Sequence, residues 1–515
     1  MSRTRNAFRN ILWGTIQKIV LLFMPFLTRT VIIKVLGADY IGLSSLFASI
    51  LGLLSLAELG VSNAIISSMY KPIVNNDTKT ICALLAFFRK AYHLIGAVIS
   101  VIGLCILPFL DGLIKGDVPA DVNIRLLYLI YLFNTAVSYF MFSYKSCLFV
   151  AHQRGDINSK ILTLLSLSQY LLQITLLLLF RNYYCYVIII PLITIANNIV
   201  VAITARKYYP QYICTGKLNR VIRSDIKQRV TGLMLAKVSA TIRSSIDSLF
   251  ISTMLGLTIT AMYSNYFHIV TAVAGLIQVL EGSIIAGVGN SLATESKEKN
   301  YNDFLKFTFM LQWIVGICSI MILCIEQPFM YIWVGKELMF KDAMVVLCAI
   351  YLYVNCISLI RGVYTQALGM WWSLRYVSFV DIFINTTLNF VLGKLLGAYG
   401  ILLATIVDMA LVSIPWTTYY LFRDYFGISL LHKYFLQYIK YFLAAIIVGT
   451  ICYTILLPLN SLSTYISVLL KLLSGLILSN VMYYLVFKRN KYFADFVSML
   501  TRMLERIPPL DHILH

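Results

Sequence analysis

The chain has 515 residues, of which 60% are apolar and only 12% are charged, whereas a soluble domain has about 45–50% apolar and about 25% charged residues. This composition excludes a water-soluble fold and predicts a polytopic membrane protein. The 42 Lys and Arg residues exceed the 22 Asp and Glu residues, which gives a net charge of +20. The positions of the basic residues should therefore carry information on both topology and function.

Apolar runs of roughly 20 residues predict transmembrane helices, because the strands of a membrane barrel are shorter and alternate in polarity. We expect an all-α fold with about fourteen transmembrane helices. The expected spans are 11–33, 41–67, 82–110, 124–149, 159–180, 184–204, 230–254, 260–292, 304–333, 343–367, 373–393, 398–421, 436–459 and 464–487. The first run follows Arg3, Arg5 and Arg9 but has no small-residue cleavage site after it, so we interpret it as a retained helix.

The distribution of basic residues in the loops supports this topology. With fourteen spans, 25 Lys and Arg residues fall on the side of both termini and 7 on the opposite side. By the positive-inside rule, both termini are cytoplasmic. The longest cytoplasmic loop, 205–229, is strongly basic, which is typical of a topology determinant beside anionic head groups. The tail at 489–515 has apolar residues at helical spacing, which predicts an amphipathic helix on the inner membrane surface.

Two short sequence matches, about 220 residues apart, indicate an internal repeat. They pair Leu36-Gly37 with Leu255-Gly256, and Glu58 and Gly60 with Glu281 and Gly282. The repeat predicts two pseudo-symmetric six-helix lobes followed by two further helices. The expected divisions are 1–204 (first lobe), 205–229 (basic linker), 230–421 (second lobe), 435–488 (helices 13 and 14) and 489–515 (tail).

Once charges at the span ends are counted with the loops, ten basic and five acidic residues remain inside the spans. Each costs roughly 2.5–3.5 kcal/mol at a helix centre, so such residues usually face a bundle interior or a wet cavity. Residues near span ends can instead extend to the interface, and we expect this of Arg89, Lys90, Lys145, Lys440 and Lys471. We assign three further residues to the adjoining loops, namely Lys306, Glu326 and Arg375.

Charges deeper in the spans are the candidate functional residues. Lys18 and Arg29 are eleven residues apart, which places them on one face of the first helix. Arg243 and Asp247 are one turn apart on the seventh helix, and a structural ion pair is the alternative explanation. Lys237 lies nearer the cytoplasmic end of the seventh helix.

A polar stripe on the eleventh helix should also face inward, because it would be costly in lipid. It consists of Ser378, Asp381, Asn385 and Asn389, and hydrogen bonding between helices is its alternative role. Arg361 stands alone in the second half of the tenth helix. Together these residues predict a wet cavity with excess positive charge, which would attract a phosphate or pyrophosphate group.

Motifs for enzyme chemistry are missing from the sequence. There is no P-loop, GxSxG, HExxH or DxD motif. The expected extracytoplasmic loops have at most about a dozen residues, too short to build a site around a sugar acceptor. We therefore do not expect an enzyme.

Three segments resemble a known family. Residues 26–43 (FLTRTVIIKVLGADYIGL), 56–65 (LAELGVSNAI) and 245–252 (SIDSLFIS) are similar to the corresponding helices of Wzx-type polysaccharide (O-antigen) repeat-unit flippases. These belong to the multidrug/oligosaccharidyl-lipid/polysaccharide flippase superfamily. Many such proteins have twelve helices, and the extra pair here resembles the last two helices of the lipid II flippase.

The resemblance implies a MATE-like fold of two lobes around a central cavity and alternating access. It implies transport of an undecaprenyl-diphosphate-linked oligosaccharide to the outer leaflet of a bacterial inner membrane. The positions that could bind the anionic carrier are Lys18, Arg29, Lys237, Arg243 and Arg361. A second set, with a role in H+ or Na+ coupling or in structure, comprises Glu58, Asp247, Glu281, Asp381 and Asn385.

No metal or other cofactor is expected. The expected partners are the lipid-linked substrate, membrane lipids, and a polysaccharide polymerase with its chain-length machinery, but no nucleic acid. Two other functions stay open. A cation-coupled multidrug exporter of the same superfamily would favour more acidic than basic cavity residues. A membrane glycan polymerase or transferase would need a site that the short loops do not provide.

Overall fold

Helices make up nearly all of the protein. The computed structural model describes residues 3–58, 61–116, 118–370 and 373–498, and no β-strand occurs among them. Each of the fourteen expected spans coincides with a helix or with a helix that is broken along its length. The prediction of an all-α polytopic membrane protein is therefore confirmed.

Length and hydropathy alone select fewer spans than the sequence predicted. In the described part of the chain, ten helices are long and apolar enough to cross a membrane, or up to eleven if the bent pair Ile124–Phe140 and Ser143–Ala151 is one span. The three other expected spans correspond to α2 with α3, to α9 and to α10. α2 has only 16 residues, and a short 3-10 turn at Ser55–Glu58 follows it.

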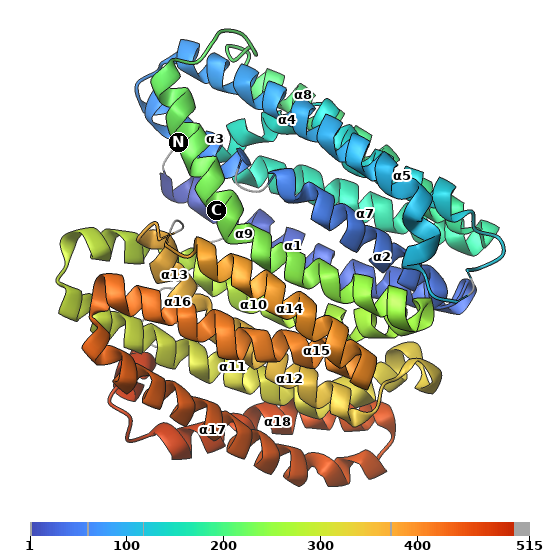
Figure 1. Cartoon of the computed structure of the whole chain (residues 1–515), viewed down its shortest axis with the longest axis vertical. Helices are drawn as coiled ribbons and strands as arrows, with labels where there is room; N and C mark the ends of the chain where they lie inside the picture. Colours follow the sequence, from blue (N-terminus) through green and yellow to red (C-terminus); the bar gives the residue numbers. More distant parts are fainter. Residues whose placement is uncertain (1–2, 59–60, 117, 371–372, 499–515) are drawn as a thin grey trace. The chain divides into compact units, whose positions relative to one another are not determined.

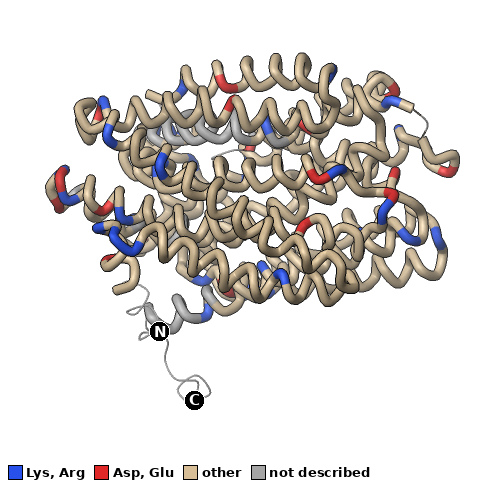
Figure 2. Tube along the Cα trace, turned by 90° about the horizontal axis from the view of Figure 1, so that it is seen from below, with Lys and Arg blue, Asp and Glu red and all other residues tan. Residues whose placement is uncertain are grey.

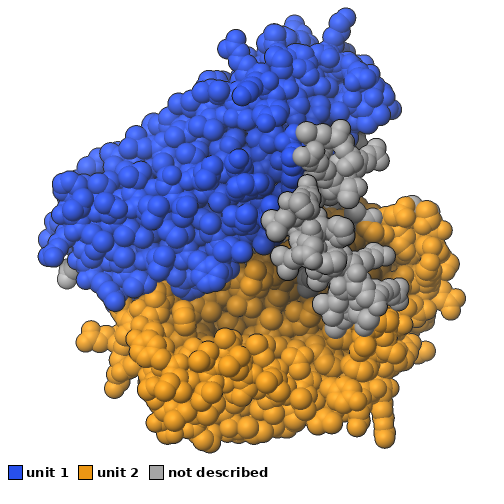
Figure 3. Space-filling view, turned by 180° about the vertical axis from the view of Figure 1, so that it is seen from behind, with its two compact units in different colours: residues 1–264, 389–401 blue, residues 265–388, 402–515 orange. Residues whose placement is uncertain are grey.

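The chain divides into two compact units, which are described separately (Figure 3). Unit 1 comprises residues 1–264 and 389–401, and unit 2 comprises residues 265–388 and 402–515. The boundaries expected at residues 204 and 230 stay a prediction.

Unit 1 is built from the N-terminal helices (Figure 1). These are α1 (Arg3–Val35), α2 (Asp39–Leu54), α3 (Val61–Val74), α4 (Thr78–Ile106), α5 (Ile124–Phe140), α6 (Ser146–Ala151), α7 (Gly155–Phe180), α8 (Tyr183–Tyr208) and α9 (Arg220–Leu255). α7 packs between α1 and α8, α5 packs between α4 and α8, and α2 packs on α9. Large side chains fill the core of this unit, and Phe47, Phe88, Tyr128 and Phe149 are fully buried.

Two glycine turns in unit 1 have the same geometry, as the sequence repeat predicts. Gly37 ends α1 with a φ of 118°, and Gly256 ends α9 with a φ of 97°. The amide of Gly37 donates to the Ile32 carbonyl (3.1 Å), and that of Gly256 donates to the Ile251 carbonyl (3.2 Å). Both bonds span five residues, the pattern of a glycine-terminated helix. Only glycine adopts this left-handed backbone without strain.

Unit 2 is organised around α11. Its complete helices are α11 (Lys297–Val334), α12 (Asp342–Ile357), α13 (Leu359–Ala367), α16 (Ile414–Leu421), α17 (Leu431–Leu456) and α18 (Thr464–Phe487). It also contains most of α14 (Arg375–Leu396) and of α15 (Ala398–Asp408). α10 (Leu257–Thr294) begins in unit 1 and continues in unit 2. α11 contacts α12, α17 and α18. In its apolar window 67% of the residues are buried, against 22% in α17 and in α18, so α11 is the core helix of the unit.

The described start of the C-terminal tail packs on unit 2. Residues 493–498 are helical. The Phe493 ring stacks on Trp313 at 5.6 Å between centroids, and Phe496 lies 5.4 Å from the same ring. This part of the expected surface helix therefore packs Phe493 and Phe496 against α11. The rest of the expected helix, from residue 499, lies outside the described residues.

Candidate functional site

Charged residues lie mainly near helix ends, and a few lie within the helices (Figure 2). In unit 1, Arg29 is a charged residue within a helix. It lies in α1, is half-buried, and donates from Nη1 to the Ser264 hydroxyl at 3.0 Å. Tyr183 and Tyr186 of α8 are its electrostatic neighbours, and their rings stack at 5.7 Å. Lys18 lies on α1 with an exposed side chain. Arg29 thus combines a guanidinium with neighbouring hydroxyl groups, which suits an anionic group.

Glu58 is held by two tyrosines within unit 1. The Tyr92 hydroxyl of α4 donates to Glu58 Oε1 at 2.6 Å, and the Tyr139 hydroxyl of α5 donates to Oε2 at 2.5 Å. The rings of Tyr92 and Tyr139 meet edge to face, with centroids 5.3 Å apart. A polar carboxyl group is thereby satisfied in an apolar region, where an unsatisfied one would be costly. We call Glu58, Tyr92 and Tyr139 the carboxyl–tyrosine cluster.

Asp247 on α9 forms a second buried polar cluster in unit 1. Its side chain is 3% exposed. It accepts from Asn389 Nδ2 at 2.8 Å and from the Tyr263 hydroxyl at 3.4 Å. Arg243 lies one turn earlier on α9 and is half-buried. Lys237 lies on the same helix, but its side chain is outside the described residues.

The side chain of Glu281 on α10 is also outside the described residues. The polar stripe of α14 is buried, as predicted for an inward-facing stripe. Asp381 and Asn385 are each 2% exposed and Asn389 is fully buried. Asn385 donates to the Thr405 hydroxyl of α15 at 3.2 Å within unit 2.

Arg361 is packed inside unit 2. It lies on the short helix α13, is 7% exposed, and donates from Nη1 to the Thr418 hydroxyl of α16 at 3.2 Å. Tyr434 and Tyr438 of α17 are its electrostatic neighbours. A ligand would reach its guanidinium only after these helices moved apart.

Two assignments made from the sequence are wrong for unit 2. Glu326, expected in a loop, lies inside α11 and is 1% exposed, because α11 continues eight residues beyond it to Val334. Lys306, also expected in a loop, lies inside α11 too, and its Nζ pairs with Asp495 at 3.3 Å. Arg375 is the first residue of α14.

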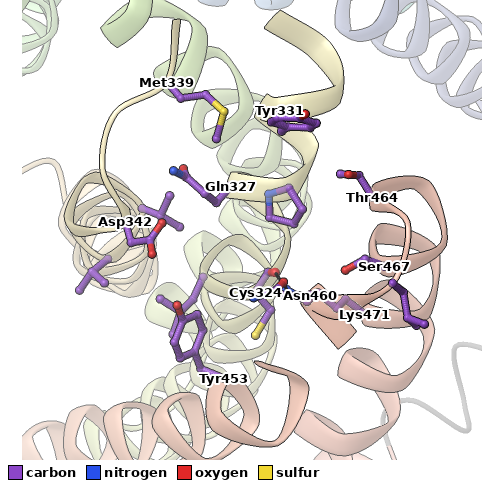
Figure 4. A pocket seen from close by; sticks show the side chains of 15 residues that line it. Cys324, Gln327, Tyr331, Met339, Asp342, Tyr453, Asn460, Thr464, Ser467 and Lys471 are labelled. Carbon is purple, nitrogen blue, oxygen red and sulfur yellow. Dashed lines mark hydrogen bonds between the residues drawn. The ribbon is translucent and has the colours of Figure 1, made fainter. Parts of the chain in front are cut away.

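Lys471, which the sequence predicts to extend to the membrane interface, is bonded to a residue of the turn between α17 and α18. It is 4% exposed, and its Nζ donates to Asn460 Oδ1 at 2.7 Å and to the Cys324 carbonyl at 3.3 Å. Figure 4 shows Lys471 and Asp342 on opposite sides of a pocket of about 290 Å³ in unit 2. The local acceptors satisfy the ammonium group within the unit.

The predicted cationic residues are divided between the units. Lys18, Arg29, Lys237 and Arg243 belong to unit 1, and Arg361 belongs to unit 2. Among those with described side chains, Lys18, Arg29 and Arg243 are exposed or half-buried and Arg361 is buried. Arg361 is thus the one buried cation among those of the set whose side chains are described.

Sequence reasoning missed the tyrosines of the carboxyl–tyrosine cluster. The signal was present, because Tyr92 and Tyr139 fall within apolar spans, away from the span ends where interfacial tyrosines gather.

Comparison with solved structures identifies the fold. An inward-facing multidrug resistance MATE transporter of the MOP superfamily is 15% identical, with a TM-score of 0.62, over 82% of this chain and 99% of its own. The lipid II flippase MurJ in an inward closed conformation is 12% identical, with a TM-score of 0.65, over 93% of this chain and 99% of its own.

A MOP superfamily transporter from Pyrococcus furiosus, described as having a binding pocket of reverse polarity, is 13% identical, with a TM-score of 0.59, over 83% of this chain and 96% of its own. No protein-family model matches the chain, and no curated protein matches it at the level of sequence. The chain therefore has the MATE-like fold of the MOP superfamily transporters.

Proposed function

We propose that the chain is a flippase, which moves an undecaprenyl-diphosphate-linked oligosaccharide from the cytoplasmic to the outer leaflet of a bacterial inner membrane for surface polysaccharide synthesis. The observation that carries the proposal is the half-buried guanidinium of Arg29, which donates to the Ser264 hydroxyl, within a fold shared with a lipid flippase. In this proposal both termini are cytoplasmic, and the polymerase and chain-length machinery act on the product.

The extent of the structural match favours the flippase branch of the fold. The MurJ structure covers 93% of this chain, and the first MATE structure covers 82%. The MurJ structure thus covers a further 11% of this chain. The two C-terminal helices, α17 and α18, are also the part of the chain that resembles the last two helices of the lipid II flippase.

The balance of charge inside the spans also favours an anionic substrate. In the spans expected from the sequence, basic residues outnumber acidic ones, even when the buried Glu326 of α11 is counted. The Pyrococcus furiosus transporter, described as having a binding pocket of reverse polarity that suggests a different function, shares this fold. We propose that Lys18, Arg29, Lys237 and Arg243 bind the diphosphate.

The remaining predicted residues have supporting roles in the proposal. Arg361 would contact substrate only in a conformation that opens the packing around α13. Glu58, Asp247, Glu281 and Asp381 are the candidates for H+ or Na+ coupling, because a carboxyl group in a region of low dielectric can exchange a proton near neutral pH. Asn385 would position its neighbours through its hydrogen bond to Thr405.

The proposal can be tested by transport into proteoliposomes. A labelled undecaprenyl-diphosphate oligosaccharide would be placed in the outer leaflet, and its loss from that leaflet would be measured. Arg29→Ala and Arg243→Ala should slow translocation at least tenfold, while Lys34→Ala, which removes an exposed lysine from the end of α1, should not. Wild-type transport by both arginine variants would contradict the proposal.

The same vesicles test the multidrug alternative. Efflux of cationic dyes, driven by an H+ or Na+ gradient and independent of lipid-linked oligosaccharide, would favour an exporter. Its inhibition by Glu58→Gln without any effect of Arg29→Ala would strengthen that conclusion.

A further inference from the structure

Unit 1 contains a basic pocket that the proposed transport function does not use. It has a volume of about 410 Å³ and lies where α4, the α5–α6 bend and the end of α8 meet. Arg89, Lys145 and Arg206 line it, together with Tyr144 and Tyr209. No carboxylate occurs among the described residues that line the pocket.

The broken span explains why these cations share one concavity. α5 ends at Phe140, and the chain then bends by 50° before it continues through α6. Lys145 lies in this bend with its Nζ 5.1 Å from the centre of the Phe142 ring. Arg89 lies beside the Tyr144 hydroxyl, so it is directed to the same place from α4. The sequence predicted that Arg89 and Lys145 would extend to the interface separately.

The charge of the pocket is not balanced within the described residues. Arg89, Lys145 and Arg206 form no ion pair with a described carboxylate, and the nearby Asp156 is already bound by Arg154 Nε at 2.9 Å. Arg89 and Lys145 are half-buried. Uncompensated cations of this kind attract a phosphate group, and arginine binds it with matching geometry.

Aromatic groups stabilise one wall of the pocket. Tyr209 stacks on His152 at 4.5 Å and on Tyr212 at 6.0 Å, measured between ring centroids. Burial raises the pKa of Tyr209 to about 12. Its hydroxyl is protonated at neutral pH, as that of an ordinary tyrosine is, and can donate a hydrogen bond to an anion.

We propose that this pocket binds the phosphate of an anionic phospholipid head group from the adjoining leaflet. Basic pockets between membrane helices bind such head groups. The loop charges predict that this end of unit 1 is cytoplasmic, where Arg206 belongs to the basic 205–229 segment. The site is separate from Arg29 and does not depend on the transported substrate.

The test is lipid binding to the purified full-length protein, measured by native mass spectrometry after release from phosphatidylcholine nanodiscs that contain phosphatidylglycerol. Each basic contact at a membrane surface is worth about 1 kcal/mol, so Arg89→Gln should weaken phosphatidylglycerol retention about fivefold and Arg89→Gln with Lys145→Gln about thirtyfold. Lys90→Gln is the matched control, because Lys90 follows Arg89 but is exposed and does not line the pocket.

A third variant tests the site even if the double variant fails to fold. Arg206 is exposed at the end of α8, so Arg206→Gln should leave the thermal unfolding temperature unchanged and still weaken retention about fivefold. Equal loss in Lys90→Gln, or no loss in Arg89→Gln and Arg206→Gln, would overturn the site.

Two competitors identify the source of the phosphate. Displacement of phosphatidylglycerol by inorganic phosphate at equal concentration would overturn the lipid assignment. Displacement by undecaprenyl diphosphate, with preference over phosphatidylglycerol, would replace it with a binding site for the carrier. Retention of phosphatidylglycerol against both supports the proposal, whether or not the chain transports oligosaccharide.

Discussion

The carboxyl–tyrosine cluster of unit 1 allows a sharp test of how polar groups stabilise this fold. Tyr139→Phe removes the hydroxyl that donates to Glu58 at 2.5 Å and leaves the ring packing in place. Tyr128→Phe on the same helix removes a hydroxyl that donates to the neutral Gly103 carbonyl at 3.1 Å. The two variants make the same chemical change next to an acidic and a neutral acceptor.

The expected magnitudes follow from the type of acceptor. A hydrogen bond to a charged group contributes about 1.5–3 kcal/mol, and a neutral one about 0.5–1.5 kcal/mol. Measured side-chain hydrogen bonds in a membrane protein average about 0.6 kcal/mol and reach about 1.7. We therefore expect Tyr139→Phe to cost about 1.5 kcal/mol, roughly a tenfold change in the unfolding equilibrium. Tyr128→Phe should cost about 0.6 kcal/mol.

The assay is reversible unfolding in mixed micelles, combined in a double-mutant cycle with Glu58→Gln. If the carboxylate is the important acceptor, Tyr139→Phe should cost much less in the Glu58→Gln background, whereas Tyr128→Phe should cost the same in both backgrounds. Equal costs for the two tyrosine variants, or no coupling of Tyr139 to Glu58, would refute the reasoning.

Two further predictions concern close packing and a helix cap in unit 1. A Cβ added at Gly42 would collide with the Leu257 backbone carbonyl, whereas nothing lies within 4 Å of one added at Gly14. Gly42→Ala should therefore lower stability by about 1–3 kcal/mol, and Gly14→Ala should not lower it; thermal unfolding measures both. Asp77 caps α4 by accepting from the Thr80 amide at 3.0 Å, so Asp77→Ala should lower the thermal unfolding temperature. The bonds to Thr80 hold the pKa of Asp77 below its ordinary value of 3.8. The stabilisation by this cap is therefore present at neutral pH and is lost as the pH falls through the lowered pKa. Chemical shifts of the Asp77 carboxyl group measure that titration.

The positions of the helices could be predicted from the sequence because hydropathy along the chain is a local property. The breaks within the spans could not be predicted in the same way. Residues 141–142, where α5 gives way to the bend, are Met and Phe and continue the apolar run. The glycine turn at Gly37 was visible, because a left-handed residue after an apolar helix favours glycine.

The surroundings of the charged side chains were harder to predict. The α14 stripe was expected to face inward, because its four polar residues at helical spacing must share a face. Whether a single charged side chain is buried depends on hydrogen-bond acceptors that are distant in sequence. Lys471 is satisfied by Asn460 and by the Cys324 carbonyl, 147 residues away, and no local pattern reveals that pairing.

Unit 1 is formed by two separate stretches of the chain, and this has a consequence for biogenesis. Its residues run from the N-terminus to 264 and then include 389–401, where Asn389 donates to the buried Asp247. A membrane chain is inserted from its N-terminus during synthesis, so unit 1 cannot be completed until about 400 residues have been made. Asp247 on α9 is therefore inserted into the bilayer before Asn389, whose amide donates to its carboxylate, has been synthesised. Chaperoning or slow translation over residues 264–389 would therefore affect the yield of folded protein more than the same delay after residue 401.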